Sequence, residues 1–325
     1  MHRRIFIGLS TAALGLAAAP LAVAQDAYPA RPVRLVAPFP PGGSTDVLAR
    51  VVAQKLSGTL GRQVVVENRP GAAGNIGHEV VAKAPPDGYT LLLSAKASLV
   101  TNPHLYKQLP FDPLADFAPI SLVATAGSVL IVHPSVPAQN VKQLIALAKA
   151  KPGVLNYGSG GIGGTYHVVT EVFIAATGTK IVHVPYKGGG VAVTDLVAGN
   201  VDLVFADMVP AIPQIRSGRV RALAVTSGHR QAVLPDVPTM AEAGVKEPFP
   251  ENWWALNSPR GTPAAIIKRL NGDLGQVLQQ PDVKEKLADL GVVAAHSTPE
   301  RVRELIRRES PQMAKILKEA GVKPE

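Results

Sequence analysis

The chain contains no cysteine among its 325 residues. This absence excludes disulfides, thiolate catalysis and every metal site that needs a cysteine ligand. Aromatic residues make up only 5% of the chain, too few for the stacking platforms that hold single-stranded nucleic acids. Beyond the N-terminal region, no segment approaches the about 20 consecutive apolar residues that a membrane-spanning helix needs. A disulfide-stapled, nucleic-acid-binding or membrane-embedded protein is therefore not expected.

Charge is present in modest excess of one sign, with 33 basic and 24 acidic residues and a net charge of +9. The basic residues are scattered, except for one cluster in which acidic residues alternate with them. This cluster comprises Arg301, Arg303, Arg307 and Arg308, with Glu300, Glu304 and Glu309 between them. Such spacing gives ion pairs on a solvated helix face rather than a track for phosphates. We predict no nucleic-acid partner, and a mild positive field that attracts small anions.

The N-terminus has the pattern of a secretory signal. Arg3 and Arg4 precede the apolar stretch Ile5–Leu21, and the small residues Ala22-Val23-Ala24 follow it. A charged front, a short apolar centre and a small-residue exit predict a signal peptide over residues 1–24, cleaved near Ala24. The alternative, a membrane anchor, is disfavoured because polar residues, glycine and proline interrupt the short apolar centre. Export by the general or the twin-arginine route stays open.

Two glycine-rich turns each join an apolar, strand-like run to the start of a helix-like run. The first turn, Pro38–Asp46 (PFPPGGSTD), follows Val33–Ala37, and the second, Gly158–Thr165 (GSGGIGGT), follows Val154–Tyr157. A helix N-terminus offers unpaired backbone N–H groups and a partial positive charge. Glycine lets an anion approach these groups because it has no Cβ. The two turns therefore predict two lobes that grip one small anion between them.

Apolar, β-branched runs alternate with helical patterns along the whole chain. They are continuous rather than alternating in polarity, as expected for strands covered on both faces. This order predicts an α/β fold with parallel sheets and helices on both sides. The expected strands are Val33–Ala37, Val64–Glu67, Thr90–Ser94, Val129–His133, Val154–Tyr157, Ile181–Pro185, Val201–Phe205 and Val220–Thr226.

The limits of the two lobes are inferred from the segments that could connect them. The proline-rich segment Asn102–Ile120 is expected to be a long surface connection, and the apolar Ser121–Val132 to carry the chain into a second lobe. Val220–Thr226 is the matching candidate for the return. Ligands of two-lobed α/β folds lie in the cleft near the carboxyl ends of strands. The expected limits are 25–124 plus 227–325 for the first lobe and 125–226 for the second.

The second glycine turn also contains the spacing G-x-G-x-x-G, at Gly158, Gly160 and Gly163. A dinucleotide site needs, in addition, an acidic residue at the end of the next strand to hold the ribose. Here that strand ends Val184-Pro185-Tyr186-Lys187, with no acidic residue. Lys187 could meet a 2′-phosphate, but only half of the motif is then present. We predict no cofactor.

Several single residues could carry chemistry, and each has a structural alternative. His167, in the first turn of a helix, could act as a base, or it could pack against the core or cap the helix. Asp46, near a helix start, could offset the helix dipole. Lys96 could face a ligand or solvent. Asp207 follows the apolar run Val201–Ala206, so it should lie at a strand's carboxyl end and face the cleft. It could cap the next helix or could bind a ligand amine, a ligand hydroxyl or a water.

At this point the residues carry a family resemblance. The chain resembles the Bug family, the TctC-like substrate-binding proteins of tripartite tricarboxylate transporters. The resemblance covers nearly the whole chain after the signal, in the family's order. The matching stretches include Pro38–Arg50 (PFPPGGSTDVLAR), Val66–Gly77 (VENRPGAAGNIG), Pro86–Leu92 (PDGYTLL), Tyr157–Phe173, His183–Gly189 (HVPYKGG) and Pro235–Thr239.

The resemblance implies a periplasmic two-lobed binding protein of type II, a Venus-flytrap, rather than an enzyme. It implies a monomer that closes around a small carboxylate and docks to membrane subunits of the transporter. The ligand-binding residues it implies are Phe39, Pro40, Gly42, Gly43, Ser44, Thr45 and Asp46 in the first lobe, and Gly161, Gly163, Gly164, Thr165, His167, Tyr186 and Asp207 in the second. Gly164 departs from the family, which often carries a hydroxyl residue there.

Two other functions remain as alternatives. A ligand-sensing subunit of a signalling system would use the same lobe closure, so the sequence does not separate it from a transport receptor. An enzyme acting on a small organic acid would need a nucleophile, a base and a residue that orients the base. The chain offers His167 and Asp207 but no such set.

Overall fold

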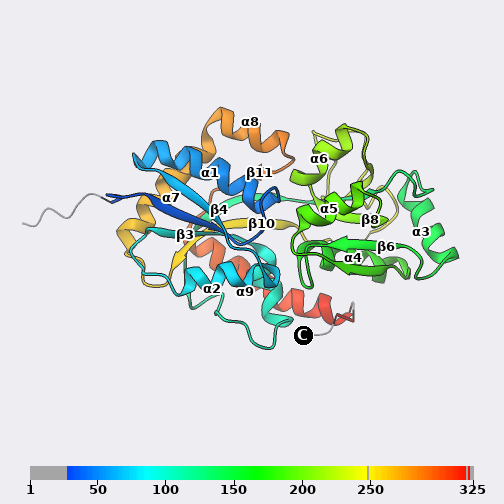
Figure 1. Cartoon of the computed structure of the whole chain (residues 1–325), viewed down its shortest axis with the longest axis horizontal. Helices are drawn as coiled ribbons and strands as arrows, with labels where there is room; N and C mark the ends of the chain where they lie inside the picture. Colours follow the sequence, from blue (N-terminus) through cyan, green and yellow to red (C-terminus); the bar gives the residue numbers. More distant parts are fainter. Residues whose placement is uncertain (1–27, 247–248, 320, 323–325) are drawn as a thin grey trace, which may run out of the picture.

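The computed structural model describes residues 28–246, 249–319 and 321–322. Two β-sheets, each covered by helices on both faces, lie side by side along the long axis of the molecule (Figure 1). The predicted signal peptide and its cleavage site fall outside the described residues. Within them, no helix is both long enough and apolar enough to cross a membrane.

The first sheet has the strand order β11-β4-β10-β3-β1-β2. β1 runs parallel to β2 and β3, whereas β10 runs antiparallel to both β3 and β4. β3 is buried over its whole length, as its uncharged sequence predicts. The strands are β1 (Val33–Ala37), β2 (Val64–Asn68), β3 (Thr90–Ala95), β4 (Phe117–Ala126), β10 (Asn252–Pro259) and β11 (Val293–Ala294).

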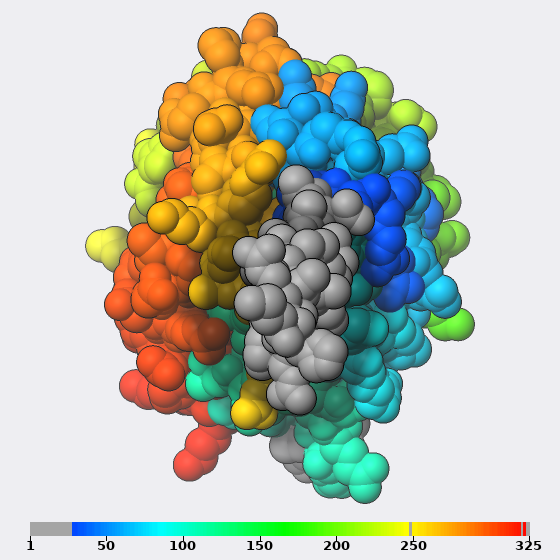
Figure 2. All heavy atoms as spheres, turned by 90° about the vertical axis from the view of Figure 1, so that its left-hand side faces the viewer, coloured from blue at the N-terminus to red at the C-terminus, as the bar shows by residue number. Residues whose placement is uncertain are grey.

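Helices cover the two faces of this sheet with separate hydrophobic clusters. On one face lie α1 (Ser44–Leu60), α7 (Ala264–Gln279) and α8 (Pro281–Asp289), whose surfaces adjoin at the end of the molecule (Figure 2). On the other face lie α2 (Asn75–Ala82) and α9 (Pro299–Glu319) (Figure 1). Each helix turns an apolar stripe inward because its apolar residues recur every three to four positions.

The second sheet has the order β7-β6-β8-β5-β9. α3 (Val141–Ala150) and α4 (Thr165–Thr177) pack on one face, α5 (Gly189–Val197) and α6 (Met208–Arg216) on the other. β6 runs parallel to β7 and β8, whereas β5 is antiparallel to β8 and β9. The strands are β5 (Ser128–Val132), β6 (Asn156–Ser159), β7 (Val182–Pro185), β8 (Leu203–Asp207) and β9 (Arg221–Val225).

The α/β, two-lobed fold predicted from the sequence is confirmed, and each expected strand run overlaps an observed strand. The expectation of purely parallel sheets is wrong, because both sheets are mixed. Two strands make the first sheet mixed: β10, which returns from the second sheet and enters antiparallel between β3 and β4, and β11, which pairs antiparallel with β4 at the edge. The expected surface connection Asn102–Ile120 is also wrong in part. Leu105 and Phe111 are buried in it, and β4 begins at Phe117.

The chain crosses from the first sheet to the second at Gly127, between β4 and β5, and returns between β9 and β10. After β9 the chain stays with the second sheet, since Met240 and Val245 belong to its core. The lobe limits given above remain a prediction. The position of Met240 and Val245 favours a later return to the first lobe, at about Phe249–Asn252.

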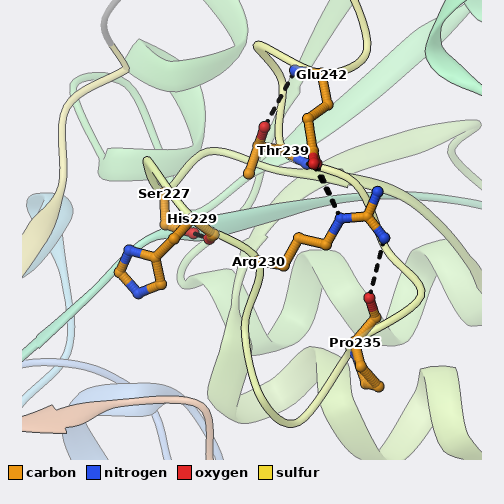
Figure 3. A network of polar contacts seen from close by, with 6 residues as sticks. All are labelled: Ser227, His229, Arg230, Pro235, Thr239 and Glu242. Carbon is orange, nitrogen blue, oxygen red and sulfur yellow. Dashed lines mark hydrogen bonds and ion pairs between the residues drawn. The ribbon is translucent and has the colours of Figure 1, made fainter.

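A network of polar contacts shapes the segment that follows β9 (Figure 3). Nε of Arg230 donates to both carboxylate oxygens of Glu242, at 3.2 and 3.0 Å, and Nη1 of Arg230 donates to the carbonyl of Pro235. The backbone N–H of Thr239 donates to Glu242, and that of Glu242 donates to the Thr239 hydroxyl, a reciprocal pair like a capping box. The contacts fold this segment onto itself and not onto the first lobe.

The approach of α2 to the first glycine turn generates a stability prediction. A Cβ added to Gly77 would lie 2.6 Å from Cβ of Pro38, 2.8 Å from its Cα and 2.9 Å from the carbonyl oxygen of Arg69. Backbone atoms cannot move aside cheaply, so Gly77→Ala should destabilise the protein by about 1–3 kcal/mol. Chemical denaturation measures the change.

Gly58→Ala is the matched control for this substitution. Gly58 lies in α1, where an added Cβ would meet no atom within 4 Å. Alanine there should stabilise the protein by up to about 1 kcal/mol, through helix propensity alone. Equal effects of the two substitutions would contradict the close packing of α2 on the turn.

Candidate functional site

A cavity of about 60 Å³ lies between the two lobes. It is bounded by the first glycine turn and the adjoining strands of the first lobe, and by three turns of the second. The first lobe contributes Phe39, Pro40, Pro41, Gly43, Ser44, Thr45, Ala95, Ala97, Asn252 and Trp254. The second lobe contributes Gly160, Gly164, Thr165, Tyr166, Gly188, Gly189, Gly190, Val191 and Asp207.

Four helices of the described chain begin at this cavity, namely α1 from the first lobe and α4, α5 and α6 from the second. The residues preceding α1, α4 and α5 are Gly43, Gly164 and Gly188, and no side chain caps these three helices. Their first N–H groups thus lack intrahelical acceptors and side-chain acceptors alike. Each helix also presents a partial positive charge. The cavity is therefore a place where an anion finds several backbone donors.

Charged side chains are nearly absent from the cavity wall. None of the described lining residues is lysine or arginine, and Asp207 supplies the single carboxyl group among them. An anion there would be held by backbone dipoles and hydroxyl groups. Such donors need no reorganisation when the anion arrives, since the fold already fixes them.

Asp207 ends β8 and joins the two lobes across the cavity. Its Oδ2 accepts a hydrogen bond of 2.8 Å from Oγ of Ser44, and its Oδ1 accepts one of 3.2 Å from Nδ2 of Asn252. Burial raises the pKa of Asp207 to about 6, although these two hydrogen bonds oppose the rise. The side chain does not cap α6. The carboxyl group therefore faces the cavity, as the sequence predicted, and gains a proton in mildly acidic solution.

The first glycine turn is held from behind by Asp46, which does not line the cavity. Its carboxylate accepts hydrogen bonds from the backbone N–H of Gly42 at 3.0 Å and from Nδ2 of Asn68 at 2.8 Å, and pairs with Arg50. Burial alone would raise the pKa of Asp46, but the contacts with Arg50, Gly42 and Asn68 together hold it below its usual value. Asp46 thus fixes the shape of the turn that carries Ser44.

The second glycine turn is supported by a stacked pair of histidines. Nδ1 of His167 accepts a hydrogen bond of 3.0 Å from the backbone N–H of Gly163, and the ring stacks on His183 with centroids 4.2 Å apart. Nε2 of His183 contacts Oγ of Ser159 at 2.6 Å. Burial lowers the pKa of both histidines to about 4, and the neighbouring His183 contributes to the fall at His167. Both rings are therefore neutral near pH 7.

The sequence-predicted site residues fall into two groups in the structure. One group lines the cavity: Phe39, Pro40, Gly43, Ser44, Thr45, Gly164, Thr165 and Asp207. The other does not line it: Gly42, Asp46, Gly161, Gly163, His167 and Tyr186. Lys96, which the sequence placed either at a ligand or in solvent, does neither, because it is buried in an ion pair with Glu309.

Sequence reasoning missed the lining residues Pro41, Ala95, Ala97, Gly160, Tyr166 and Val191, together with two larger parts of the wall. The run Gly188–Gly190, which caps and begins α5, is a third glycine-rich helix start, and its composition could have revealed it. Asn252 and Trp254 lie on β10, where Nε1 of Trp254 donates to Oγ1 of Thr45 at 3.0 Å. No local signal marks them, since their contact with the first turn arises only from strand pairing.

Two α/β lobes joined by crossing segments, with uncapped helix N-termini around a cavity between them, define a two-lobed solute-binding protein. No group of three or more His, Asp or Glu side chains in the described chain is arranged to hold a metal ion. The model of the tripartite tricarboxylate transporter family receptor matches residues 48–322, and the chain belongs to this family. Receptors of this family are periplasmic solute-binding proteins.

Individual relatives match over almost the full length. The chain is 42% identical to protein BugT of Bordetella pertussis, over 98% of this chain and 97% of that protein. The structure of R. palustris Rpa4515 with adipate has a TM-score of 0.90 and 36% identity, and covers 92% of this chain and 100% of the other. The structure of MatC (Rpa3494) from Rhodopseudomonas palustris with bound malate has a TM-score of 0.85 and 30% identity. It covers 89% of this chain and 100% of the MatC chain.

The buried histidines generate a pH prediction. Unfolded histidine binds a proton near pH 6.5, whereas folded His167 and His183 do so only near 4. Protons therefore favour the unfolded state, and stability should fall as the pH drops from about 6.5 to 4. His167→Asn keeps an acceptor for Gly163 but cannot titrate.

This substitution should make the dependence shallower by about 1.4 kcal/mol per pH unit in that window. Denaturant unfolding at a series of pH values measures the slope, and above about pH 7 the two curves should run parallel. An unchanged slope would show that His167 does not stay neutral in the fold.

Proposed function

We propose that this protein is a periplasmic receptor that captures a small carboxylate in the cavity between its lobes and delivers it to the membrane subunits of a tripartite tricarboxylate transporter. The observation that carries this proposal is the meeting of three uncapped helix N-termini at a cavity without a basic side chain. Adipate bound to Rpa4515 and malate bound to MatC support it, since both are small carboxylates.

The energetic argument rests on the helix ends. An anion at a partly buried helix N-terminus gains up to ~2 kcal/mol, and hydrogen bonds to an anion are worth about 1.5–3 kcal/mol each. Micromolar affinity requires about 8 kcal/mol. Contributions from α1, α4 and α5 therefore reach the needed scale without an ion pair. Backbone donors also fit a carboxylate of any chain length, so the rest of the wall must select the ligand.

Closure of the lobes follows from the same arrangement. α1 belongs to the first lobe, whereas α4 and α5 belong to the second, so a carboxylate contacts all three helix ends only when the lobes are together. Binding thereby shifts the equilibrium between open and closed forms toward the closed form. We propose that the closed form, as a monomer, is the one that the membrane subunits recognise.

We retain all the predicted site residues, in two roles. Those that line the cavity contact the ligand directly or through water. The others support them: Asp46 and Gly42 shape the first turn, and Gly161, Gly163, His167 and Tyr186 shape the second. We also retain removal of the signal peptide near Ala24.

A thermal-shift panel of organic acids tests this function. At a hundred times its Kd, a true ligand should stabilise the protein by about 2.7 kcal/mol. Mono-, di- and tricarboxylates, including adipate and malate, should contain at least one such acid. No shift from any acid in the panel would contradict the proposal.

Gly190→Leu tests where the acid binds. Gly190 lines the cavity and faces the first glycine turn directly, so that an added Cβ would lie 3.4 Å from the backbone nitrogen of Gly43. A leucine side chain should fill the space between the lobes and abolish the shift. Gly228→Leu is the control, because Gly228 is exposed and an added Cβ there meets nothing within 4 Å. Retained binding in Gly190→Leu would place the ligand elsewhere.

Asp207 generates a second prediction. Its pKa of about 6 means that the cavity gains a negative charge as the pH rises through 6. A plain dicarboxylate such as adipate should therefore bind several-fold more weakly at pH 8 than at pH 5.5, by calorimetry. Asp207→Asn should remove this difference.

The same experiment distinguishes ligand types. When Asp207 ionises, its carboxylate becomes a better acceptor for a ligand hydroxyl or ammonium group. The affinity of an acid that carries such a group should therefore fall less with rising pH than that of adipate, or should increase. An Asp207→Asn protein with the original pH dependence would show that another group controls the charge of the cavity.

A further inference from the structure

The far end of the second lobe is rich in lysine and poor in acidic residues. No aspartate or glutamate occurs in the sequence between Asp116 and Glu171, a stretch that contains three lysines. This stretch forms α3 and the loops at its two ends, and α3 lies at one end of the long axis of the molecule (Figure 1). We call the exposed surface there the basic tip, and its residues are Lys142, Lys149, Lys151, Val154, Lys180 and Val182.

α3 turns its lysines outward because its apolar residues pack against the core of the second lobe. Val141, Leu144 and Ala148 are buried, whereas Lys142 and Lys149 are exposed. These two lysines are separated by about two helical turns, so they lie on the same side of the helix. One face of α3 is therefore a basic surface that no part of the second lobe's core covers.

The loop after α3 adds two exposed valines and a further lysine to this surface. The backbone N–H of Gly153 donates to the carbonyl of Lys180, and that of Val182 donates to the carbonyl of Leu155, both at 2.9 Å. These two bonds hold the loop beside the start of β7. Val154 is 64% exposed and Val182 is 49% exposed. The basic tip thus combines positive charge with an apolar corner.

The charge of the basic tip is not balanced within the lobe. None of its four lysines pairs with an acidic side chain in the part of the chain that the structure describes. Acidic residues of the same lobe have other partners. Asp202 accepts a hydrogen bond of 2.8 Å from the backbone N–H of Asn156, and Glu171 contacts the hydroxyl of Tyr157.

The stability of α3 accounts for only part of this arrangement. Lys149, in the last turn, and Lys151, which follows the helix, complement the negative end of the helix dipole. Lys142 lies in the first turn, where a positive charge opposes the dipole and no acidic residue of that turn offsets it. The helix itself therefore gives no reason for a lysine at this position.

We propose that the basic tip binds the anionic headgroups of a lipid bilayer. Lysine is a compact point charge that attracts phosphate without a fixed geometry, and the exposed valines can enter the interfacial layer of the bilayer. Interfaces with proteins are instead enriched in aromatic residues and arginine and depleted in lysine, and the basic tip contains none of the enriched types. None of its residues lines the ligand cavity, so the inference does not depend on the proposed function.

Vesicle co-sedimentation tests this inference. The protein is used without residues 1–24, so that the predicted signal peptide cannot enter the bilayer. At low ionic strength it should bind vesicles of phosphatidylcholine with phosphatidylglycerol, and it should stay in solution with phosphatidylcholine alone. Added salt should release it, because salt screens exposed charges. No binding to the anionic vesicles would contradict the proposal.

Neutralising the lysines locates the contact. The triple variant Lys149→Gln, Lys151→Gln and Lys180→Gln should bind anionic vesicles about tenfold more weakly or worse, since each lysine near an anionic surface contributes to the attraction. The matched control is Lys268→Gln, Lys284→Gln and Lys286→Gln, which removes the same charge from exposed positions on α7 and α8. The control should bind like the unchanged protein. An equal loss in both triple variants would show that net charge, and not the basic tip, drives binding.

Val154→Ser with Val182→Ser distinguishes a bilayer from an acidic protein. This double variant should bind anionic vesicles several-fold more weakly, because less apolar surface enters the bilayer. Soluble polyglutamate serves as the probe for an acidic polypeptide, and it should bind weakly and equally to both proteins. If polyglutamate binds as tightly as the vesicles, or if the valine substitutions leave vesicle binding unchanged, the lipid proposal is wrong.

The proposed function is checked separately in the same variants. Each should give the same thermal shift with adipate as the unchanged protein, because the basic tip is not part of the cavity wall. Vesicle binding without any response to organic acids would leave the basic tip standing and contradict the carboxylate function. A response to adipate without vesicle binding would do the reverse.

Discussion

The structure depends on one constraint: backbone N–H groups at a helix start must find an acceptor, and no side chain caps any of the four described helices that begin at this cavity. Glycine precedes α1, α4 and α5, where serine or aspartate would normally supply a cap. The missing caps leave donors to which, under the proposed function, a carboxylate binds. α1 lies on one lobe and α4 and α5 lie on the other, so under the proposed function the same donors couple binding to lobe closure.

The donors can serve this purpose only if the turns that carry them are rigid. Each turn has its own buried support: Asp46 accepts from Gly42 in the first, and His167 accepts from Gly163 in the second. These side chains hold the backbone without entering the cavity. Asp46 and His167 bind one N–H group in each turn and leave the N–H groups at the helix starts without a side-chain acceptor. The supporting residues and the lining residues are therefore two different sets.

Asp207 places an ionisable carboxyl group among the N–H donors of the cavity, and its negative charge repels a bound anion. Its burial is costly, as the rise of its pKa to about 6 shows, and Ser44 and Asn252 repay part of that cost. The group therefore works against anions without a donor of their own and in favour of those that bring a hydroxyl or ammonium group. Under the proposed function, Asp207 selects among carboxylates, whereas the helix ends capture them.

Local signals in the sequence determined the α/β class, the two glycine turns and the place of Asp207 at the end of a strand. Each depends on near neighbours: β-branched runs form strands, glycine permits tight turns, and the residue after a strand lies at its carboxyl end. The tertiary structure alone decided that β10 inserts antiparallel between β3 and β4, and that Asn252 and Trp254 thereby reach the first turn. It also decided that Lys96 pairs with Glu309, more than two hundred residues away, rather than with a ligand. Strand pairing and ion pairs between distant segments depend on the whole fold, so no window of the sequence contains them.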